Sequence, residues 1–502
     1  MNATSTASPR PWRLGLILVL AVLAFSAPQA ALLPLLDRDE PRFAEASREM
    51  LQSGNFIVPT FNHEPRYAKP PLIYWCQAFF FTLFGENAFA ARLPSILATA
   101  GTALLLFFWG VELASECIGM IAGLAYPFCL QTIQQGRVAT ADALLIFFMT
   151  LTVYAGWKVI TLSGEMRRAE KISTALIVQN YLWGLVLALG FTGGFLAKGP
   201  EALLPLIPML ICAWRSGGGV YIDLIANFLL GLCLVLFWAL PAYVDTDGDY
   251  WRQGLNEGVG TRMVSGLQGH GATTFGWYLL SLPLYLLTFW LSALPWSPLL
   301  VTHRKKIFGG WQPDPLDTYL LLNIALIVLV FSLMVTKLPH YTLPAFPLVA
   351  LLLGRRWIAA DLHPRLPTQL AGGFGLVLAL LTLILVPIAL AYNATPSPVG
   401  ILVREAGSAL TPETEFAVVD FQEPNTVWEM RRVTPKYAQS ISNLDAGAFL
   451  DQPGPHAVIL SSSAWKKIEA GTIDLSSFKI FQARGWNAAK GSFVDLTLVV
   501  KS

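Results

Sequence analysis

The chain is short of charge. Only 13% of its 502 residues are charged and 54% are hydrophobic, whereas about a quarter of the residues of a soluble protein are charged. This shortage excludes both an ordinary soluble globule and a disordered chain. The 34 Lys and Arg residues nearly balance the 32 Asp and Glu residues, so no polybasic nucleic-acid-binding protein is indicated. The composition predicts one large membrane domain and a small extra domain.

Several motifs that are typical of soluble enzymes and metal-binding proteins are absent as well. The five cysteines form no CxxC pair, so the sequence suggests neither a disulfide framework nor a zinc site. It contains no Walker loop, no G-x-S-x-G elbow and no G-x-G-x-x-G after a predicted strand. Asp37 and Asp39 match a DxD pattern, which is a weak signal by itself. These absences leave the membrane segments and the loops between them as the source of any function.

Long apolar segments predict eleven transmembrane helices. A helix that crosses the hydrocarbon core needs about 20 predominantly apolar residues. The first segment runs directly into a charged loop and lacks a clear A-x-A site, so we expect an uncleaved anchor rather than a signal peptide. The predicted helices are residues 14–35, 91–110, 117–134, 142–161, 177–196, 202–214, 221–243, 276–301, 317–335, 341–354 and 369–392.

The positions of Lys and Arg predict which side of the membrane each loop occupies. Short cytoplasmic loops carry an excess of these residues. If the N-terminus is cytoplasmic, all the basic connections lie inside, namely residues 10–13, 162–176, 215, 304–306 and 355–365. The aromatic-rich segment 70–85 would break this pattern if it crossed the membrane, so we expect an interfacial helix there. Eleven crossings then place the C-terminus outside.

The tail of the chain differs in character from the rest. Residues 399–410 and 464–470 read as short helices. Four stretches read as strands, and they are Glu415–Phe421, His456–Ser462, Phe478–Gln482 and Phe493–Val500. We therefore predict a transmembrane domain over residues 1–392, with interfacial helices in the first outer loop, 36–90, and an outer α/β tail domain over residues 393–502. The fold class is an α-helical polytopic membrane protein with a small C-terminal α/β domain.

Unusual polar residues gather in the predicted outer loops. Carboxylates and cations that converge from loops on a rigid helical scaffold are the common plan of a catalytic cleft. The candidates are Asp39, Glu40, Arg42, Lys69, Arg137, Asp142, Lys198, Glu257, Arg262, His270, Lys337, His340 and Tyr341. Lysine and arginine hold a phosphate and stabilise its charge as it leaves, and a carboxylate accepts a proton from an attacking hydroxyl. The loops therefore suit a phosphate-bearing lipid.

Each candidate also has a plain structural alternative. A carboxylate at the start of a helix can serve as a cap, a lysine at the membrane edge as an anchor, and a histidine as an ordinary loop residue. These alternatives apply to Asp39, Asp142, Lys69, Lys198, Lys337, His270 and His340, and Arg262 can pair with Glu257. They do not explain why all the unusual residues share one side of the membrane.

Five sequence motifs resemble those of one family. Two segments of this chain resemble the first outer loop of bacterial lipid-phosphate-sugar transferases. They are DRDEPRFAEASREMLQSGNFIVPTFN and YAKPPLIYW. This family comprises the aminoarabinose transferases and the protein mannosyltransferase-related membrane glycosyltransferases. Its later motifs resemble, in the same order, GRVATADALLIFF, LAKGPEALLP and KLPHYTLPAFP, so the likeness spans residues 14–355. It implies a C-type glycosyltransferase fold and a polyprenyl-phosphate sugar donor, commonly undecaprenyl phosphate in bacteria.

The resemblance assigns roles to the matching residues. Asp39 matches the catalytic aspartate of the family's first loop, with Arg42 expected to orient it, and Asp142 matches a second functional aspartate. The family's donor-phosphate pocket is lined at positions that match Lys69, Lys198, Arg262 and Tyr341. The other polar residues of the outer loops are expected to support the site, and they are Glu40, Arg137, Glu257, His270, Lys337 and His340.

Two positions depart from the aminoarabinose transferases. Those enzymes carry an acidic residue before the lysine that matches Lys69, where this chain has Ala68, and a metal-binding histidine where it has Glu257. Because both positions belong to a proposed metal site, the sequence predicts no certain cofactor and leaves a divalent metal open, with Glu257 and His270 as alternative ligands. The identity of the sugar is open for the same reason.

The resemblance implies an inverting transfer of a sugar from a polyprenyl-phosphate donor to lipid A or to another envelope glycan or lipid. The protein would lie in the bacterial inner membrane with its N-terminus cytoplasmic and its tail domain periplasmic, and no nucleic-acid partner is expected. A secondary transporter or lipid flippase is the alternative, although its ionisable groups would lie near the bilayer midplane, often in repeated halves. A membrane scaffold whose tail binds a partner is a third interpretation.

Overall fold

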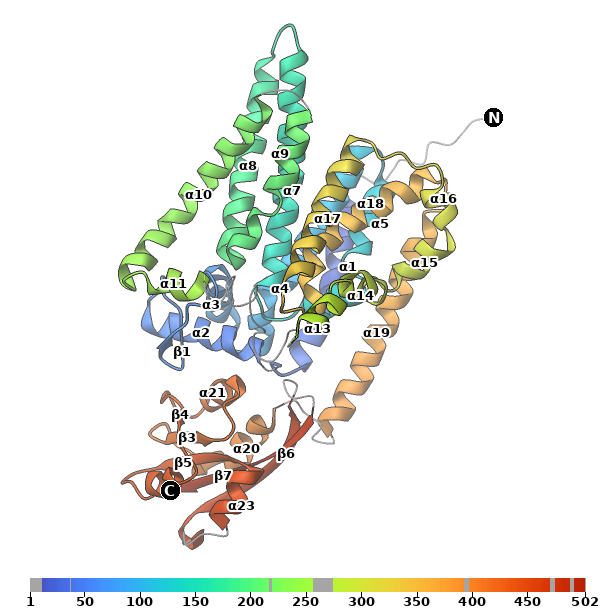
Figure 1. The fold of residues 1–502 in the computed structure, drawn as a ribbon. Coiled ribbons are helices and arrows are strands. Elements are labelled where there is room, and N and C mark those ends of the chain that lie inside the picture. The colour runs from blue at the N-terminus through green and yellow to red at the C-terminus, as the bar shows by residue number, and fades with distance from the viewer. Residues whose placement is uncertain are drawn as a thin grey trace. The chain divides into compact units, whose positions relative to one another are not determined.

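The computed structural model of the chain contains two compact units. Unit 1 comprises Met1–Ala27, Tyr67–Ile73 and Leu93–Ala379, and unit 2 comprises Pro28–Arg66, Tyr74–Arg92 and Leu380–Ser502. The residues that the structure describes are 11–36, 38–215, 219–255, 274–391, 397–469, 475–487 and 492–501. Unit 1 holds most of the long helices and unit 2 holds the larger β-sheet (Figure 1).

Eight helices in the described stretches are long and apolar enough to cross a membrane. They are α1 (Pro11–Leu32), α4 (Ala88–Leu113), α7 (Asp142–Arg168), α8 (Thr174–Lys198), α10 (Val220–Asp245), α17 (Pro315–Leu333), η3 (Pro339–Ala345) continued by α18 (Phe346–Ala359), and α19 (Arg365–Ala391). A ninth span results if α13 (Phe275–Ser281) and α14 (Leu284–Ser292), which are bent by 41°, are counted together. The chain is a multi-pass membrane protein, as its composition predicted.

Three of the eleven predicted spans are not single long helices in the described residues, because prolines interrupt them. Pro127 separates α5 (Glu116–Ala125) from α6 (Leu130–Gln135), and Pro283 lies between α13 and α14. Pro205 stands between η1 (Pro200–Leu203) and the ten-residue α9 (Leu206–Arg215). A proline removes a helical hydrogen bond and clashes with the preceding turn. Mean hydropathy over a window does not detect such breaks, so the sequence predicted one continuous span where the structure has two or more short helices.

The other short elements outside the tail include the predicted interfacial helix. Residues 70–85 contain α3 (Leu72–Phe84), whose 13 residues are fewer than a span needs. The remaining elements are α2 (Asp39–Ser53), β1 (Thr60–Phe61), β2 (Glu64–Pro65), α11 (Asp249–Leu255), α15 (Trp296–Thr302) and α16 (Arg304–Phe308).

In unit 1, α7 and α8 form a hairpin of two closely packed helices (Figure 1). A Cβ atom on Gly190 would lie 2.8 Å from Thr152 Oγ1, and one on Gly193 would lie 2.4 Å from the Phe148 ring. Small residues at such contacts let two membrane helices approach closely. The hairpin fixes the end of α8 beside the start of α7, which is where two candidate site residues lie.

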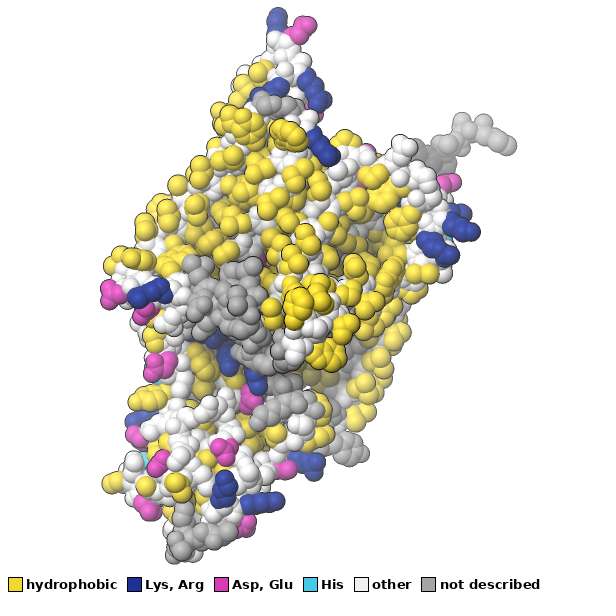
Figure 2. All heavy atoms as spheres, viewed as in Figure 1, with side chains coloured by type: hydrophobic (Ala, Val, Ile, Leu, Met, Phe, Trp, Pro, Cys, Tyr) yellow, Lys and Arg dark blue, Asp and Glu magenta, His cyan; other side chains and the backbone are white. Residues whose placement is uncertain are grey.

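Apolar side chains cover the outward faces of the unit 1 helices. Figure 2 shows hydrophobic side chains over α8 and α10, and Lys and Arg gathered at the tip of the α7–α8 hairpin. Leu182, Leu189, Leu229 and Phe237 are among the exposed residues of these two helices. A helix surface of this kind suits contact with lipid, with its basic ends in the interface.

The tail domain of unit 2 is built on a five-stranded mixed sheet. The strand order is β4-β3-β5-β7-β6, in which β3 runs parallel to β4 and β5 while β7 runs antiparallel to both β5 and β6. The register pairs Val418 with Ile459 and Ile459 with Leu498. The strands are β3 (Glu415–Val419), β4 (Gln439–Ser440), β5 (His456–Ser461), β6 (Lys479–Asn487) and β7 (Ser492–Lys501).

Alternating side chains of the sheet form a core on each face. One core joins α20 (Pro398–Ala406) to residues such as Phe416 and Leu498. The other joins α22 (Asp445–Leu450) and α23 (Ser462–Glu469) to residues such as Val419 and Val458. The small C-terminal α/β domain predicted from the sequence is thus confirmed, with all four predicted strands present. The remaining elements are η4 (Gly407–Ala409), α21 (Pro424–Met430) and η5 (Leu475–Ser477).

Most of the predicted first outer loop lies in the same unit as the tail, whereas its segment Tyr67–Ile73, which includes Lys69, belongs to unit 1. Helix α2 packs against α21, and Asn62, in the turn between β1 and β2, exchanges two hydrogen bonds of 2.9 and 2.8 Å with the backbone of Ala438. On its other side this turn is held by Glu49 of α2, which accepts from Asn62 N at 2.7 Å and from Thr60 Oγ1 at 2.5 Å. Residues more than 370 positions apart therefore form one packed body.

Candidate functional site

The start of α7 and the end of α8 meet at a buried ion pair. Lys198 Nζ donates to Asp142 Oδ1 at 2.8 Å, and Thr140 Oγ1 donates to the other carboxylate oxygen at 3.0 Å. The two charged side chains are 7% and 18% exposed. Asp142 also interacts electrostatically with His340 and Lys69. The structure thus brings together four of the residues predicted from the outer loops.

A sharp turn aims Lys198 at its partners. Gly199, which ends α8, has φ +83° and ψ −138°, a conformation that side-chain-bearing residues avoid. The turn leads into η1, where Glu201 lies 3.2 Å from Lys198 Nζ. Lys198 also lies 5.6 Å from the centre of the Tyr341 ring. The lysine is therefore held between two carboxylates and one aromatic ring.

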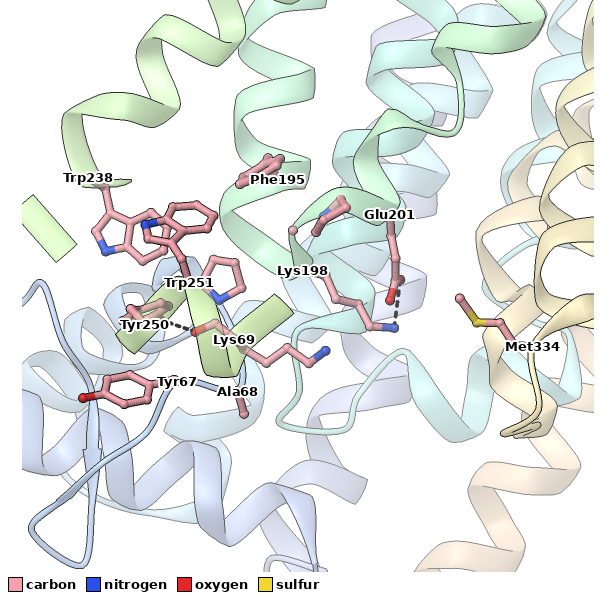
Figure 3. Close-up of a pocket in the computed structure, with 14 residues that line it drawn as sticks. Tyr67, Ala68, Lys69, Phe195, Lys198, Glu201, Trp238, Tyr250, Trp251 and Met334 are labelled. Atoms are coloured by element: carbon pink, nitrogen blue, oxygen red, sulfur yellow. Dashed lines mark hydrogen bonds and ion pairs between the residues drawn. The ribbon is translucent and has the colours of Figure 1, made fainter. Parts of the chain in front are cut away.

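A pocket lies beside this ion pair, and its empty space is about 670 Å³ when the part open to solvent is included. Lys69 and Lys198 both extend into it, while its walls are largely aromatic and apolar (Figure 3). Trp238 of α10 and Tyr250 of α11 lie 5.2 Å apart between ring centres, and Tyr250 Oη donates to the Lys69 carbonyl at 2.6 Å. Other aromatic and large apolar wall residues are Tyr67, Phe195, Trp251 and Met334. The cavity thus combines two cations and the Glu201 carboxylate with a largely apolar lining.

Tyr341 and His340 approach from the start of η3. Tyr341 is buried at 5% exposure, and its ring lies 5.1 Å from that of His340 and 5.6 Å from that of Phe331. The backbone carbonyl of Leu338, the residue before η3, accepts from Tyr285 Oη at 3.1 Å. These contacts place a conformationally fixed aromatic side chain against Lys198.

Asp39 and Arg42 belong to unit 2. Asp39 is the first residue of α2 and is exposed. Arg42 follows one turn later on the same helix. Burial and the neighbouring Arg66 lower the pKa of the Arg42 guanidinium, while Asp39 and Glu423 oppose that shift. Asp39 and Arg42 therefore influence each other electrostatically.

Glu40 forms a buried ion pair with Arg92, which gives it a structural role. Its carboxylate accepts from Arg92 Nε at 2.8 Å and from Arg92 Nη2 at 2.6 Å, and both side chains are almost completely buried. Arg92 also donates to the carbonyls of Ala30, Leu33 and Pro34. This ion pair fixes the stretch that leads into α2.

The remaining predicted residues divide between described and undescribed parts of the chain. Lys337 donates to the Met334 carbonyl at 2.6 Å and lies 4.9 Å from the centre of the Tyr278 ring. Arg137 lies half-buried between α6 and α7. Glu257, Arg262 and His270 lie outside the described residues.

The structure adds residues that sequence reasoning did not select. Glu201 lies three positions after Lys198 in a run that is otherwise apolar, so its charge was a usable signal. Trp238, Tyr250 and Trp251 gave no signal, because their contribution depends on how α10 and α11 fold back on the segment around Lys69.

The donor atoms of the described residues do not fit a metal site. No group of three or more His, Cys, Asp or Glu side chains is placed to hold an ion within the described stretches. Ala68, next to Lys69, supplies no ligand, and the alternative ligands Glu257 and His270 are not described. Charge at this site is carried by Lys69, Lys198 and their carboxylate partners.

Comparison with known proteins agrees with this arrangement. Residues 13–217 match the family described as dolichyl-phosphate-mannose-protein mannosyltransferase. The chain contains a domain of this mannosyltransferase family. Both aspartates and both cavity lysines lie inside the matched mannosyltransferase domain, whereas the tail domain lies beyond it. The family resemblance predicted from the motifs is thereby confirmed.

Individual relatives extend the similarity beyond the mannosyltransferase domain. The undecaprenyl phosphate-alpha-4-amino-4-deoxy-L-arabinose arabinosyl transferases of Edwardsiella ictaluri and Pseudomonas aeruginosa are 32% and 31% identical over 339 and 370 residues. These matches cover 67% and 72% of this chain and 57% and 62% of the relatives. The chain thus spans about three-fifths of the length of these relatives.

A solved structure shares the fold of the entire chain. The crystal structure of ArnT from Cupriavidus metallidurans bound to undecaprenyl phosphate matches with a TM-score of 0.73 at 15% identity, covering 98% of each chain. Its form in the apo state matches with a TM-score of 0.72. The predicted fold class, a polytopic glycosyltransferase fold with a small C-terminal domain, is confirmed.

Proposed function

We propose that the protein is a membrane glycosyltransferase that moves a sugar from an undecaprenyl-phosphate donor to lipid A or another envelope lipid or glycan. The observation that carries this proposal is the cavity that Lys69 and Lys198 share with aromatic walls. A phosphate on a prenyl chain needs cations for its head and an apolar surface for its chain. The names of the similar proteins, which describe undecaprenyl-phosphate-linked sugar transfer, support the same substrate class.

The proposed role of the lysines is to bind and stabilise the departing phosphate. When the bond between the anomeric carbon and the phosphate oxygen breaks, negative charge grows on that oxygen, and preorganised cations stabilise it. Lys198 would act from a fixed position, because it is hydrogen-bonded to Asp142 and lies close to Glu201. Arg262 and Tyr341 are the further residues that we propose for this pocket.

The proposed role of Asp39 is to serve the acceptor. An acceptor hydroxyl would give its proton to this carboxylate as its oxygen bonds to the anomeric carbon on the face opposite the phosphate, which inverts the configuration. An acceptor phosphate oxygen is already ionised, so Asp39 would orient it instead. We propose that Arg42 holds Asp39 in place, since the two side chains interact electrostatically within one turn of α2. Asp142 would act through Lys198.

We further propose the bacterial inner membrane as the location, with a cytoplasmic N-terminus and the outer loops and tail domain in the periplasm. The distribution of Lys and Arg supports this orientation. Residues 1–392 would then form the transmembrane domain and residues 393–502 a periplasmic domain. Cysteine accessibility from the periplasm at positions on the α7–α8 tip and in the tail tests the orientation.

A transfer assay in detergent tests the function. Purified protein is mixed with radiolabelled undecaprenyl-phosphate sugars and a total lipid and envelope extract, and Asp39→Asn and Lys69→Ala variants are run beside the wild type. Label that moves to an acceptor, that is lost in Asp39→Asn and that needs more donor in Lys69→Ala would support the proposal. Absence of transfer with every donor, together with donor movement across proteoliposomes, would favour the transporter.

A further inference from the structure

Asp39 lies among three arginines. Arg38 precedes it in the chain, Arg42 follows it by one turn of α2, and Arg66 acts electrostatically on Arg42. Arg66 is committed elsewhere, because its Nε donates to Tyr74 Oη at 3.1 Å and its guanidinium lies 5.4 Å from the centre of the Phe43 ring. Arg38 and Arg42 are the cations that sequence proximity gives to Asp39.

The Asp39 carboxylate nevertheless has no ion-pair partner within the described residues. No hydrogen bond and no salt bridge joins it to any of them, and its side chain is exposed. A carboxylate that must accept a proton or hold an acceptor needs this accessibility, since a guanidinium clamped on it would occupy both oxygens. Arg38 must therefore be held away from Asp39 by another group, while Arg42 interacts with Asp39 electrostatically and forms no ion pair with it.

Glu423 of the tail domain supplies that hold. It stands just before α21, is 7% exposed, and lies 3.6 Å from Arg38 Nε. Its other oxygen accepts from the Asn487 amide of β6 at 3.2 Å. Glu423 also acts electrostatically on Arg42. A carboxylate from the far end of the chain thus faces both arginines that flank Asp39.

The tail brings Glu423 to this position through several fixed contacts with the first loop. Arg431, at the end of α21, donates to the Glu86 carbonyl at 2.9 Å, and Trp428 stacks on Phe81 with ring centres 6.1 Å apart. Asn62 and Ala438 add a pair of hydrogen bonds. Because these contacts fix α21 against the first loop, the place of Glu423 beside Arg38 is determined by packing and does not depend on one exposed ion pair.

We propose that Glu423 is a positioning residue for Asp39. By holding Arg38, it keeps the Asp39 carboxylate open to the acceptor. This inference rests on the proposed function in giving Asp39 its role, but the structural half of it, that Glu423 keeps Arg38 off Asp39, stands by itself. It also gives the tail domain a role in transfer: it supplies a counter-charge to the catalytic loop.

Chemical labelling of carboxylates tests the structural half without any activity. Carbodiimide with glycine ethyl ester labels accessible carboxylates, and peptide mass spectrometry reports the rate at Asp39, with exposed Glu64 as the internal reference. In Glu423→Gln, Arg38 should turn to Asp39 and slow its labelling about fivefold, the strength of an exposed ion pair. The double variant Arg38→Gln/Glu423→Gln should restore the wild-type rate. An unchanged rate in Glu423→Gln would overturn the proposal.

Turnover tests the functional half. We expect kcat to fall about fivefold in Glu423→Gln, with the donor KM unchanged, and to recover in Arg38→Gln/Glu423→Gln and in the charge-retaining Glu423→Asp. The matched control is Glu429→Gln, a buried acid within α21 that pairs with Arg432 inside the tail, and it should keep the wild-type kcat. If the double variant stays as slow as Glu423→Gln, the residue is merely structural and the proposal fails. Full turnover by Asp39→Asn would instead refute the proposed function and leave the labelling result standing.

Discussion

Two aspartates in this protein occupy the same position of a helix in different surroundings. Asp142 is the first residue of α7 and Asp39 is the first residue of α2, and in both helices the preceding N-cap residue gives no side-chain cap. Asp142 in unit 1 is hydrogen-bonded to Lys198 and Thr140. Asp39 in unit 2 is exposed and makes no hydrogen bond or ion pair with the described residues.

The difference shows that residue type and helical position do not determine a role. A carboxylate in a tight ion pair has its charge balanced, so it suits holding and orienting a lysine. A carboxylate without such a partner keeps its oxygens available for a ligand. The comparison predicts that changes at Asp39 affect turnover, whereas changes around Asp142 affect stability first.

The largest effect is expected from Asp39→Asn. Loss of a general base lowers kcat by about 10²–10⁴-fold, while loss of one charge in the first turn of α2 costs at most about 1 kcal/mol of stability. Transfer rates and thermal unfolding in the same detergent measure the two effects. A variant that unfolds early and is slow only for that reason would place Asp39 with Asp142 as a structural residue.

The next largest effect is expected at Glu40, the residue that follows Asp39 in the chain. Glu40→Gln removes the carboxylate that faces Arg92 in a pair less than 5% exposed, and breaking a buried pair costs about 3 kcal/mol. We expect a lower unfolding temperature than in Asp39→Asn, although the two residues are adjacent. Glu64→Gln, an exposed acid of β2, serves as the control and should unfold like the wild type. Equal stability of the Glu40 and Glu64 variants would contradict a stabilising role for the Glu40–Arg92 ion pair.

Lys198→Met removes the ion-pair partner of Asp142 and so makes its surroundings more like those of Asp39. A hydrogen bond to a charged group contributes about 2 kcal/mol, and this carboxylate keeps its bond to Thr140, so the expected loss is close to that value. Adding Asp142→Asn should recover part of the stability, because position 142 then carries no unpaired charge and only Glu201, the second carboxylate near Lys198, has lost its partner. Unfolding midpoints measure both, with Lys305→Met on α16, an exposed lysine, as the control. No recovery in the double variant would show that Asp142 is stabilised by other groups.

The fold could be predicted further than the site. The apolar segments located eight of the eleven predicted spans as long helices, and the strand pattern located all four predicted strands of the tail, because periodicity and mean hydropathy are local properties. The breaks at Pro127 and Pro283 were present in the sequence but were outweighed by the hydropathy of their windows. The packing of α2 with the tail joins residues such as Asn62 and Ala438, and no local signal reports a contact across 376 positions.

For the site, charge in an apolar context was the useful signal. It selected Lys69, Asp142 and Lys198, which the structure brings together around one cavity. It could not separate Glu40, an internal ion-pair residue, from the adjacent Asp39, because both are acids at the start of the same helix. It also missed Glu423, whose importance comes only from facing Arg38 across the fold.

The smallest effect concerns the backbone that gives Asp142 its partner. Gly199 has φ +83° and ψ −138°, and a Cβ atom there would meet no neighbour closer than 3.9 Å. Gly199→Ala therefore costs strain rather than a clash, about 1 kcal/mol, and relief of that strain would rotate the turn and weaken the bond from Lys198 to Asp142.

The control for this variant is Gly164→Ala in α7, where the backbone is helical and no atom lies within 4 Å of the added Cβ. Alanine is favoured over glycine by about 0.5–1 kcal/mol within a helix, so the control should be slightly more stable than the wild type. Opposite signs for the two Gly→Ala changes would show that the turn at Gly199, and not the loss of glycine as such, keeps Asp142 paired. If both variants gained stability, the pairing of Asp142 would not depend on this turn, and the contrast with Asp39 would lie in the side chains alone.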